Sequence, residues 1–315
     1  MLHLKLLDAP VQTFIEEHLN TNTEDLALKG SPFKDVVIPQ ILEQIQAKKK
    51  CLKKLPTWFG AKKIYYPNKI NIEQSSSEIT ALYKSNLIEG KNLLDLTGGF
   101  GVDSFYFSKK TSSVIHCEID EKLSAVVQHN FKNLKAHNIT TIAQNGLEFL
   151  EHTTRHFDWI YIDPSRRDTQ NNKHFFIEDC TPDVGQNLDL FFAHSNQLMV
   201  KLSPMLDIQA ALESLRYTKE IHVVAIKNEV KELLFIMQRD FTGEPIIKAV
   251  NLDTKQPDFD FKLSHETNTK ITYSEPLKFL YEPNASVLKA GAFKRIASEF
   301  EIKKSRLFFK SALRL

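Results

Sequence analysis

Cysteine is scarce in this sequence, with only Cys51, Cys117 and Cys180 among 315 residues. Their odd number and wide spacing exclude a disulfide framework, and they lack the paired spacing of a zinc site. We therefore expect a protein of the reducing cytoplasm that holds no metal ion.

Long apolar stretches are also missing. No run approaches the roughly 20 residues that a helix needs to span a membrane. Residues 1–20 form an amphipathic pattern with acidic side chains, which is not typical of a signal peptide. The sequence contains no internal repeat and no low-complexity tract. No membrane association is expected.

A strong charge of either sign is absent, because 41 basic residues are balanced by 39 acidic ones, for a net charge of +2. The hydrophobic and charged fractions, 42% and 25%, are those of an ordinary globular chain. The length allows two domains, or one large domain with appendages. Binding of nucleic acid would therefore depend on a local cluster of basic residues.

One stretch lacks acidic residues altogether, since Gln44 to Ile70 holds eight lysines and no acid. Four aromatic residues are interleaved with them, namely Trp58, Phe59, Tyr65 and Tyr66. Lysines neutralise phosphates while aromatic rings stack on bases, which would make this an RNA-binding surface. Substrate contacts are predicted for Lys48, Lys49, Lys50, Lys53 and Lys54. The same pattern also fits a solvated helix face beside an aromatic docking segment.

From Asn92 to about Arg239, strands and helices alternate, which predicts a doubly wound α/β sheet with helices on both faces. Strands are expected at 92–97, 113–118, 140–144, 157–163, 196–202, 220–227 and 232–238. Helices are expected at 102–109, 121–136, 146–152, 184–194 and 205–216. Only Lys227 to Lys231 join the last two strands, so these should form an antiparallel hairpin. The sheet then has six parallel strands and one antiparallel strand.

The segment from Asn92 to Asp103 is the centre of this pattern. A buried strand leads into Thr97, and the glycines Gly98, Gly99 and Gly101 make a tight turn before the next helix. Glycines let the backbone approach a ligand closely, and the first N–H groups of a helix favour an anionic group. The segment predicts a cradle for an anionic or nucleotide-like ligand.

Two acids and one amide extend this predicted cradle. Glu118 follows the second strand, where the acid of a doubly wound fold accepts hydrogen bonds from ribose hydroxyls. Asp95 suits a ligand with an ammonium group, through the backbone of the turn or a water. Asn145, after the third strand, lies where an adenine amine would be met, although an ordinary strand-end turn explains it equally. Residues 99–104 nearly match the dinucleotide fingerprint, but Ser104 replaces its last glycine.

Asp163, Pro164 and Ser165 follow the fourth strand, at the edge where doubly wound folds bind their ligands. Proline restricts φ and can hold the segment rigidly. Asp163 can accept a hydrogen bond from an exocyclic amine or take its proton. These three residues are the predicted catalytic group.

Basic side chains lie at the same edge. Arg166 and Arg167 can hold a phosphate of the substrate, or pair instead with Asp168 or Glu178. Lys201 is expected to reach the edge from the fifth strand. We predict substrate contacts for Arg166, Arg167 and Lys201.

A capped helix is expected just before the first strand. Ser77 and Glu78 suit its N-cap and first turn, and Ile79, Leu82, Tyr83 and Leu87 form the expected buried stripe. The helix either lies over the glycine turn as part of the site or is only a capped helix.

Six strings in the sequence resemble a bacterial family of class I S-adenosylmethionine-dependent methyltransferases: EQSSSEITALYK, DLTGGFGVDS, CEID, IDPSRRD, VKLSPMLD and FLYEPNASVLKAGAFK. Members carry an N-terminal helical region, the methyltransferase domain, a small ferredoxin-like piece and a THUMP-like domain. The resemblance implies parts at 1–72, 73–240 and 241–315. After Arg239, two short strand-like runs, EPIIKAVNL and FDFKL, and a helix around 284–300 indicate a small separate α+β appendage. The chain ends at Leu315, about where the THUMP-like domain should begin, so the last part is expected to be truncated.

The resemblance implies S-adenosylmethionine as the cofactor, with residues 74–77 closing over it. The expected contacts are Gln74, Ser75, Ser76, Asp95, Thr97, Gly98, Gly99, Gly101, Glu118, Asn145 and Asp163. Because THUMP domains belong to RNA-modifying enzymes, the resemblance also implies tRNA or rRNA as substrate.

No cysteine lies at the predicted catalytic edge, so a covalent adduct with pyrimidine carbon 6 is disfavoured. We therefore expect direct in-line methyl transfer to a base nitrogen. The DPSRR string differs from the DPPY form of established amine methylases, which leaves the target atom open. Two alternatives are a small-molecule methyltransferase and a non-catalytic RNA-binding protein that retains the cofactor pocket.

Overall fold

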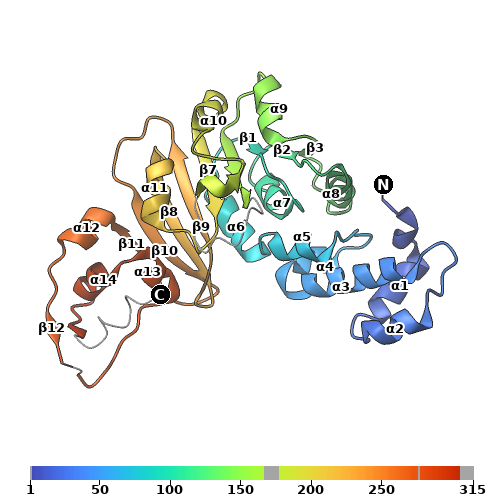
Figure 1. Ribbon diagram of the computed structural model, residues 1–315, viewed down its shortest axis with the longest axis horizontal. Coiled ribbons are helices and arrows are strands. Elements are labelled where there is room, and N and C mark those ends of the chain that lie inside the picture. The colour runs from blue at the N-terminus through green and yellow to red at the C-terminus, as the bar shows by residue number, and fades with distance from the viewer. Residues whose placement is uncertain (1, 167–176, 276, 306–315) are drawn as a thin grey trace. The chain divides into compact units, whose positions relative to one another are not determined.

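The computed structural model describes residues 2–166, 177–275 and 277–305 (Figure 1). Contacts divide the chain into two compact units. The first unit comprises Met1–Asp163 and Ala193–Asn196, and the second comprises Pro164–Phe192 and Gln197–Leu315.

Helices form the beginning of the first unit, as the sequence predicts. They are η1 (Leu4–Leu7), α1 (Ala9–Glu17), α2 (Thr23–Lys29), α3 (Ile38–Lys54), α4 (Pro56–Gly60), α5 (Lys69–Gln74) and α6 (Glu78–Asn86). The side chains of Asn22, Asn68 and Ser77 accept backbone N–H bonds and cap α2, α5 and α6. The predicted cap at Ser77 is therefore present.

The first unit also holds four parallel strands in the order β3-β2-β1-β4. They are β1 (Asn92–Asp95), β2 (Ser113–Cys117), β3 (Ile139–Ile142) and β4 (Trp159–Ile162), and the helices between them are α7 (Val102–Ser108), α8 (Glu121–Asn133) and α9 (Gly146–His152). Helix α7 packs on β2 and β3, and α8 packs on β3. All seven elements were predicted. Their observed bounds lie within a few residues of the predicted ones, and β3 begins one residue earlier than expected.

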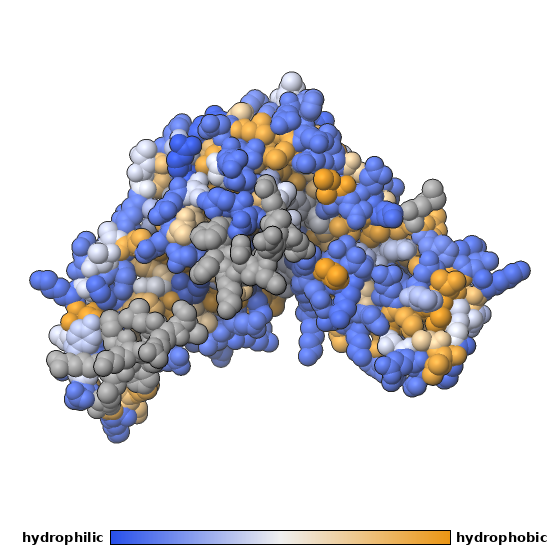
Figure 2. All heavy atoms as spheres, viewed as in Figure 1, coloured by the Kyte–Doolittle hydropathy of each residue, from blue (hydrophilic) through white to orange (hydrophobic). Residues whose placement is uncertain are grey.

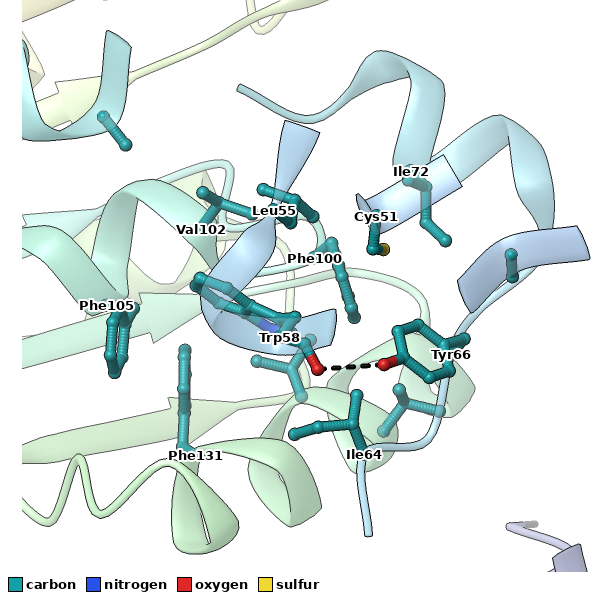
Figure 3. Close-up of a cluster of buried hydrophobic side chains, with 14 of the residues drawn as sticks. Cys51, Leu55, Trp58, Ile64, Tyr66, Ile72, Phe100, Val102, Phe105 and Phe131 are labelled. Carbon is teal, nitrogen blue, oxygen red and sulfur yellow. Dashed lines mark hydrogen bonds between the residues drawn. The ribbon is translucent and has the colours of Figure 1, made fainter. Parts of the chain in front are cut away.

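A shared hydrophobic core joins the N-terminal helices to α7 and α8 (Figure 3). Trp58, at 0% exposure, lies edge-on to Phe105, and the Tyr66 hydroxyl donates to the Trp58 carbonyl oxygen at 2.9 Å. The expectation that Trp58 and Tyr66 stack on bases is therefore wrong. The apolar surface of these rings is instead buried against Phe100 and its neighbours, which stabilises the fold.

The second unit contains a five-stranded sheet in the order β7-β9-β8-β10-β11. Its strands are β7 (Gln197–Leu202), β8 (Thr218–Ile226), β9 (Glu229–Gln238), β10 (Ile246–Leu252) and β11 (Phe259–Lys262). Strand β9 is antiparallel to both β7 and β8, so the predicted antiparallel hairpin is confirmed. Its expected place at the end of the sheet is wrong, because β10 pairs with β8. Lys227 and Asn228 connect β8 to β9, both with positive φ, as a tight hairpin turn requires.

Strands β10 and β11 were expected as short runs in a small C-terminal appendage. Strand β10 pairs in parallel with β8 along seven residues, and β11 pairs antiparallel with β10. These two strands therefore extend the sheet of the second unit instead of forming a sheet of their own.

The other described elements of the second unit are short. They are β5 (Ser165–Arg166), η2 (Ile177–Asp179), β6 (Cys180–Thr181), α10 (Leu188–His194, whose last two residues belong to the first unit), α11 (Ile208–Ser214), α12 (Leu263–Asn268), β12 (Tyr273–Ser274), α13 (Ala285–Ala290), α14 (Phe293–Glu299) and β13 (Lys304–Ser305). On the face in Figure 2, hydrophilic residues predominate and hydrophobic residues occur in separate groups. No helix within the described residues is long and apolar enough to cross a membrane.

Candidate active site

The glycine turn connects β1 to α7, as predicted. Gly99 and Gly101 adopt φ values of +54° and +77°, in the left-handed region that favours glycine. The Gly101 N–H donates to the Gly98 carbonyl oxygen at 2.9 Å and closes the turn. A Cβ on Gly99 would meet only the Thr97 carbonyl oxygen, at 3.9 Å. This side of the turn is therefore open enough for a ligand to approach the backbone.

Glu118 is tied to this turn. The Gly99 N–H donates to Glu118 Oε2 at 2.9 Å, and the Asp120 N–H donates to Oε1 at 2.8 Å. Burial raises the pKa of Glu118, and these backbone hydrogen bonds partly offset the rise. Ile119, which follows, is 70% exposed. The carboxylate is thus oriented beside the turn, with an apolar side chain next to it.

Asp95 lies beneath the turn rather than at its surface. The side chain is 1% exposed, Ser104 Oγ donates to Oδ2 at 2.5 Å, and the Thr97 N–H donates to Oδ1 at 3.3 Å. Burial raises the pKa of Asp95 to about 8. Ser104, which replaces the last glycine of the dinucleotide pattern, thus binds the acid that supports the turn.

Asp163 lies directly after β4, beside the glycine turn. Its N–H donates to Thr97 Oγ1 at 2.6 Å, and the residue is partly exposed. The two residues are 66 positions apart in sequence, but β1 and β4 are adjacent parallel strands whose carboxyl ends meet. Turn and predicted catalytic acid therefore share one edge of the first unit.

Asn145 has a local structural role in addition to any role in binding. It is the N-cap of α9, and its side chain accepts the Leu147 N–H at 2.9 Å. The side chain is only partly buried. The contact with adenine stays a prediction.

The segment predicted to close over the cofactor joins α5 to α6. Gln74 is exposed, the Ser75 hydroxyl donates to the Ile72 carbonyl oxygen at 2.9 Å, and Ser76 is buried. Ser76 Oγ donates to Asp103 Oδ2 at 2.7 Å, so this segment is bound to the helix that starts at the glycine turn.

The expected buried stripe of α6 is wrong at Ile79 and Leu82, whereas Tyr83 and Leu87 are partly buried. Ile79 and Leu82 are 42% and 47% exposed, whereas Glu78 and Lys84 are buried. The buried face of α6 is polar because Lys84 forms an ion pair with Asp103 on α7. The sequence analysis did not single out Lys84 and Asp103, although both lie within quoted strings, Lys84 at the end of EQSSSEITALYK and Asp103 in DLTGGFGVDS.

The five lysines predicted to contact the substrate have different environments in the structure. Lys48 is buried and pairs with Glu16 at 2.8 Å, and Lys50 pairs with Glu73 at 2.7 Å. Lys54 Nζ donates to two backbone carbonyl oxygens, those of Ile72 and Glu73. Lys49 and Lys53 are exposed. Lys48 is thus not available to a phosphate, because its side chain is buried against the helices it joins.

The remaining predicted residues belong to the second unit. Pro164 is partly buried, and Ser165 is exposed in β5, which pairs antiparallel with β6. Arg166 is the second residue of β5, and Arg167 lies outside the described residues. Lys201, in β7, is partly buried and faces Leu234 of β9 in register. Within the described part of the chain, no group of three or more His, Cys, Asp or Glu side chains could hold a metal ion.

The fold is that of a doubly wound α/β protein of the class I methyltransferase type. A crystal structure of a proposed methyltransferase from Porphyromonas gingivalis W83 matches with 31% identity and a TM-score of 0.83, covering 95% of this chain and 75% of that one. The chain therefore belongs to this methyltransferase family, and the predicted fold class is confirmed.

Other comparisons cover parts of the chain. The family model "Conserved hypothetical protein 95" matches residues 71–178, and a ferredoxin-like domain model matches 279–310. The proposed methyltransferase yhhF from Escherichia coli matches with 15% identity and a TM-score of 0.38, over 52% of this chain and 86% of that one. A proposed rRNA methylase from Clostridium thermocellum matches with 12% identity and a TM-score of 0.38, over 50% and 94%. None of the curated proteins compared matches this chain.

Proposed function

We propose that this methyltransferase uses S-adenosylmethionine and methylates a base nitrogen of a structured RNA, either tRNA or rRNA. The observation that carries the cofactor assignment is the hydrogen bond from the Gly99 N–H to Glu118, which fixes a carboxylate beside an open glycine turn. Such a carboxylate suits the two ribose hydroxyls of the cofactor. Exposed Ile119 offers an apolar surface for adenine.

The glycine turn would hold the methionine part of the cofactor. The turn backbone of Gly98, Gly99 and Gly101 approaches the ligand, and Gln74, Ser75 and Ser76 lie in the segment expected to cover it. S-adenosylmethionine supplies an electrophilic methyl group attached to a sulfonium. Asp95, buried beneath the turn, supports this backbone from below rather than touching the ligand.

Asp163 is the proposed catalytic residue. Its backbone is fixed by Thr97, so its carboxyl group lies at the same strand edge as the turn. It would accept a hydrogen bond from the acceptor amine, orient the nitrogen lone pair for in-line transfer and take the proton released. Pro164 and Ser165 follow it in the chain and would fix the geometry of this segment.

RNA binding would use the exposed lysines of α3. Lys49 and Lys53 are exposed and can neutralise phosphates, and half-exposed Lys50 shares its charge with Glu73. We also propose substrate contacts for Arg166, Arg167 and Lys201.

We further propose the division into parts 1–72, 73–240 and 241–315 and a cytoplasmic location.

A small-molecule substrate is the second candidate, and one observation favours it. Two of the four aromatic residues in the basic stretch are buried, which removes them from base stacking. A binding-only protein is the third candidate, in which Asp163 would have no chemical role.

Calorimetric titration with S-adenosylmethionine tests the cofactor assignment. Glu118→Ala should weaken binding about 10- to 100-fold, because it removes hydrogen bonds to a charged group worth about 1.5–3 kcal/mol. The matched control is Glu121→Ala, an exposed acid at the start of α8 that should bind like the wild type. Equal affinity for Glu118→Ala, or no binding by the wild type, would exclude the assignment.

Charge reversal tests the RNA substrate. Lys49→Glu/Lys53→Glu should weaken RNA binding and reduce its salt dependence by about one unit of slope per lost phosphate contact. The control is Lys255→Glu/Lys270→Glu, two exposed lysines of the second unit with the same charge change. Turnover of a small molecule without RNA, unaffected by either pair, would decide for the second candidate. The third fails if Asp163→Asn abolishes nucleoside methylation in cells, measured by mass spectrometry.

A further inference from the structure

Helix α6 carries its polar residues inward. Ile79 and Leu82 are exposed on it, while Lys84 is 0% exposed. An amphipathic helix normally buries its apolar stripe, and a lysine is almost never fully buried unless it is paired. This inversion indicates that the buried face of α6 is selected for specific polar contacts rather than for hydrophobic packing.

Four buried side chains, one of them Lys84, form a closed ring of hydrogen bonds and an ion pair. Lys84 Nζ lies 2.9 Å from Asp103 Oδ1, and it donates to Ser76 Oγ at 2.7 Å and to the Tyr161 hydroxyl at 3.3 Å. Asp103 Oδ2 accepts from Ser76 Oγ at 2.7 Å and from the Tyr161 hydroxyl at 2.9 Å. Each of these four side chains therefore has at least two partners in the ring.

The ring joins the three segments on which the candidate site depends. Ser76 lies in the segment expected to close over the cofactor. Asp103 is the second residue of α7, directly after the glycine turn. Tyr161 lies in β4, two residues before Asp163, and its carbonyl oxygen accepts the Leu96 N–H at 2.9 Å. All four residues belong to the first unit.

We propose that Lys84 and Asp103 are positioning residues for S-adenosylmethionine binding. They hold the 74–77 segment and the end of β4 against the glycine turn, so that the cofactor cradle is formed before the ligand arrives. The inference rests on the function proposed above. It extends that function, because it identifies an ion pair that keeps the site ordered without touching the reacting atoms.

The physical reason is preorganisation. A loop that must become ordered when its ligand binds reduces the affinity by the free energy of that ordering. Outside the ring, the side-chain hydrogen bonds described for Ser75 and Ser77 are to neighbours in sequence, within their own loop and helix turns. Ser76 is thus the residue of this segment whose side chain bonds to α7, and Glu78, the first residue of α6, adds a separate bond from the Tyr106 hydroxyl. Because Glu78 lies after the segment, loss of the ring should loosen residues 75–77.

The test variant is Lys84→Met/Asp103→Leu, which removes both charges together. Replacing a buried ion pair with apolar side chains often preserves folding, whereas removing one partner leaves a buried charge unpaired. We expect a folded protein whose affinity for S-adenosylmethionine is about tenfold weaker. Hydrogen exchange of the 75–77 amides should be faster in the free variant, and saturating S-adenosylmethionine should restore their protection.

The control is Lys289→Met in the second unit. Lys289 is a half-buried lysine whose Nζ donates to the Leu206 carbonyl oxygen at 2.8 Å, so its loss removes a comparable contact far along the chain. It should leave both the affinity and the exchange of residues 75–77 unchanged. A purely structural role for the ring would change thermal stability alone.

The results of these experiments separate a failure of the positioning role from a failure of the proposed function. If the wild type does not bind S-adenosylmethionine, the proposed function fails. If the wild type binds and the folded double variant binds equally, with unchanged exchange at 75–77, only the positioning role is overturned. If the double variant does not fold, Ser76→Ala replaces it, because it breaks the ring without removing a charge. The same loss of affinity and protection is expected, and wild-type values would overturn the role.

Discussion

Gly98 packs directly against the imidazole ring of His116. A Cβ on Gly98 would overlap this ring, which is fully buried on β2. The turn cannot move away, because the Gly98 N–H donates to the Cys117 carbonyl oxygen at 2.8 Å. Burial lowers the pKa of His116 to about 4, so the ring is neutral near pH 7. Packing therefore favours glycine at position 98, φ favours it at Gly99, and both favour it at Gly101, where a Cβ would also overlap the Phe131 ring.

Gly98→Ala should therefore destabilise the protein by about 1–3 kcal/mol, the usual cost of forcing an extra methyl into a packed site. Urea unfolding would measure this. His116→Ala on the same background should recover part of the loss, because it makes room for the methyl group. Wild-type stability in the single variant would show that the turn adapts without cost.

Asp95 should make stability depend on pH. Burial raises its pKa to about 8, against about 3.9 for an unfolded aspartate. Between these values the folded state holds a proton that the unfolded state lacks. The contribution of Asp95 to stability is therefore complete below about pH 4 and is lost as the pH rises towards 8.

Asp95→Asn stays neutral throughout this range. We expect the difference in free energy of unfolding between this variant and the wild type to increase in favour of the variant by about 2–4 kcal/mol from about pH 5 to about pH 8. Urea titrations at each pH would measure this. Asp189→Asn, an exposed aspartate on α10, should parallel the wild type. Parallel curves for Asp95→Asn as well would show that Asp95 is ionised in the folded protein.

Glu78 joins the N-terminal helices to α7. Its carboxylate accepts the Thr57 N–H at 2.6 Å, the Thr57 hydroxyl at 2.7 Å and the Tyr106 hydroxyl at 2.6 Å. Glu78→Ala leaves these donors without the acceptor, so we expect a loss of about 1–3 kcal/mol. Glu78→Gln should lose less, because its amide oxygen still accepts.

Thermal unfolding provides the measurement for Glu78. Glu151→Ala, an exposed glutamate at the end of α9, should stay within about 0.5 kcal/mol of the wild type. An equally small effect of Glu78→Ala would mean that water replaces the lost acceptor at this position.

The three cysteines should be inert in the folded protein. Cys51, Cys117 and Cys180 are all buried, and burial raises the pKa of both Cys51 and Cys117 to about 12. Since the thiolate is the reactive form, a thiol-specific reagent at about pH 8 should label them slowly in buffer and completely in denaturant. Rapid native labelling of any thiol would contradict their burial.

Much of the fold follows from local patterns. The strand, glycine turn and helix at residues 92–108 were predictable because a buried apolar run, a glycine cluster and a helical period occur in immediate succession. The β8–β9 hairpin was predictable because the predicted connection, Lys227 to Lys231, is too short for a crossover helix. These features depend on residues close together in sequence.

The roles of the aromatic and basic residues were not predictable in the same way. Trp58 and Lys48 have the same local sequence whether they face RNA or a core. Trp58 is buried because Phe100 and Phe105, more than 40 residues later, supply its packing surface. Whether such a helix face is solvated or buried depends on residues far away in the sequence, which the local pattern does not include.

The glycine turn, the acid after β2 and the alternation that places Asp163 at the same edge all follow from local patterns in the sequence. The burial of Lys84 and the exposure of Ile79 and Leu82 depend on contacts between distant elements. The physical reason is that a buried ammonium is stable only with its partners. Those partners, Asp103 and Tyr161, come from α7 and β4 and meet Lys84 only when the first unit folds.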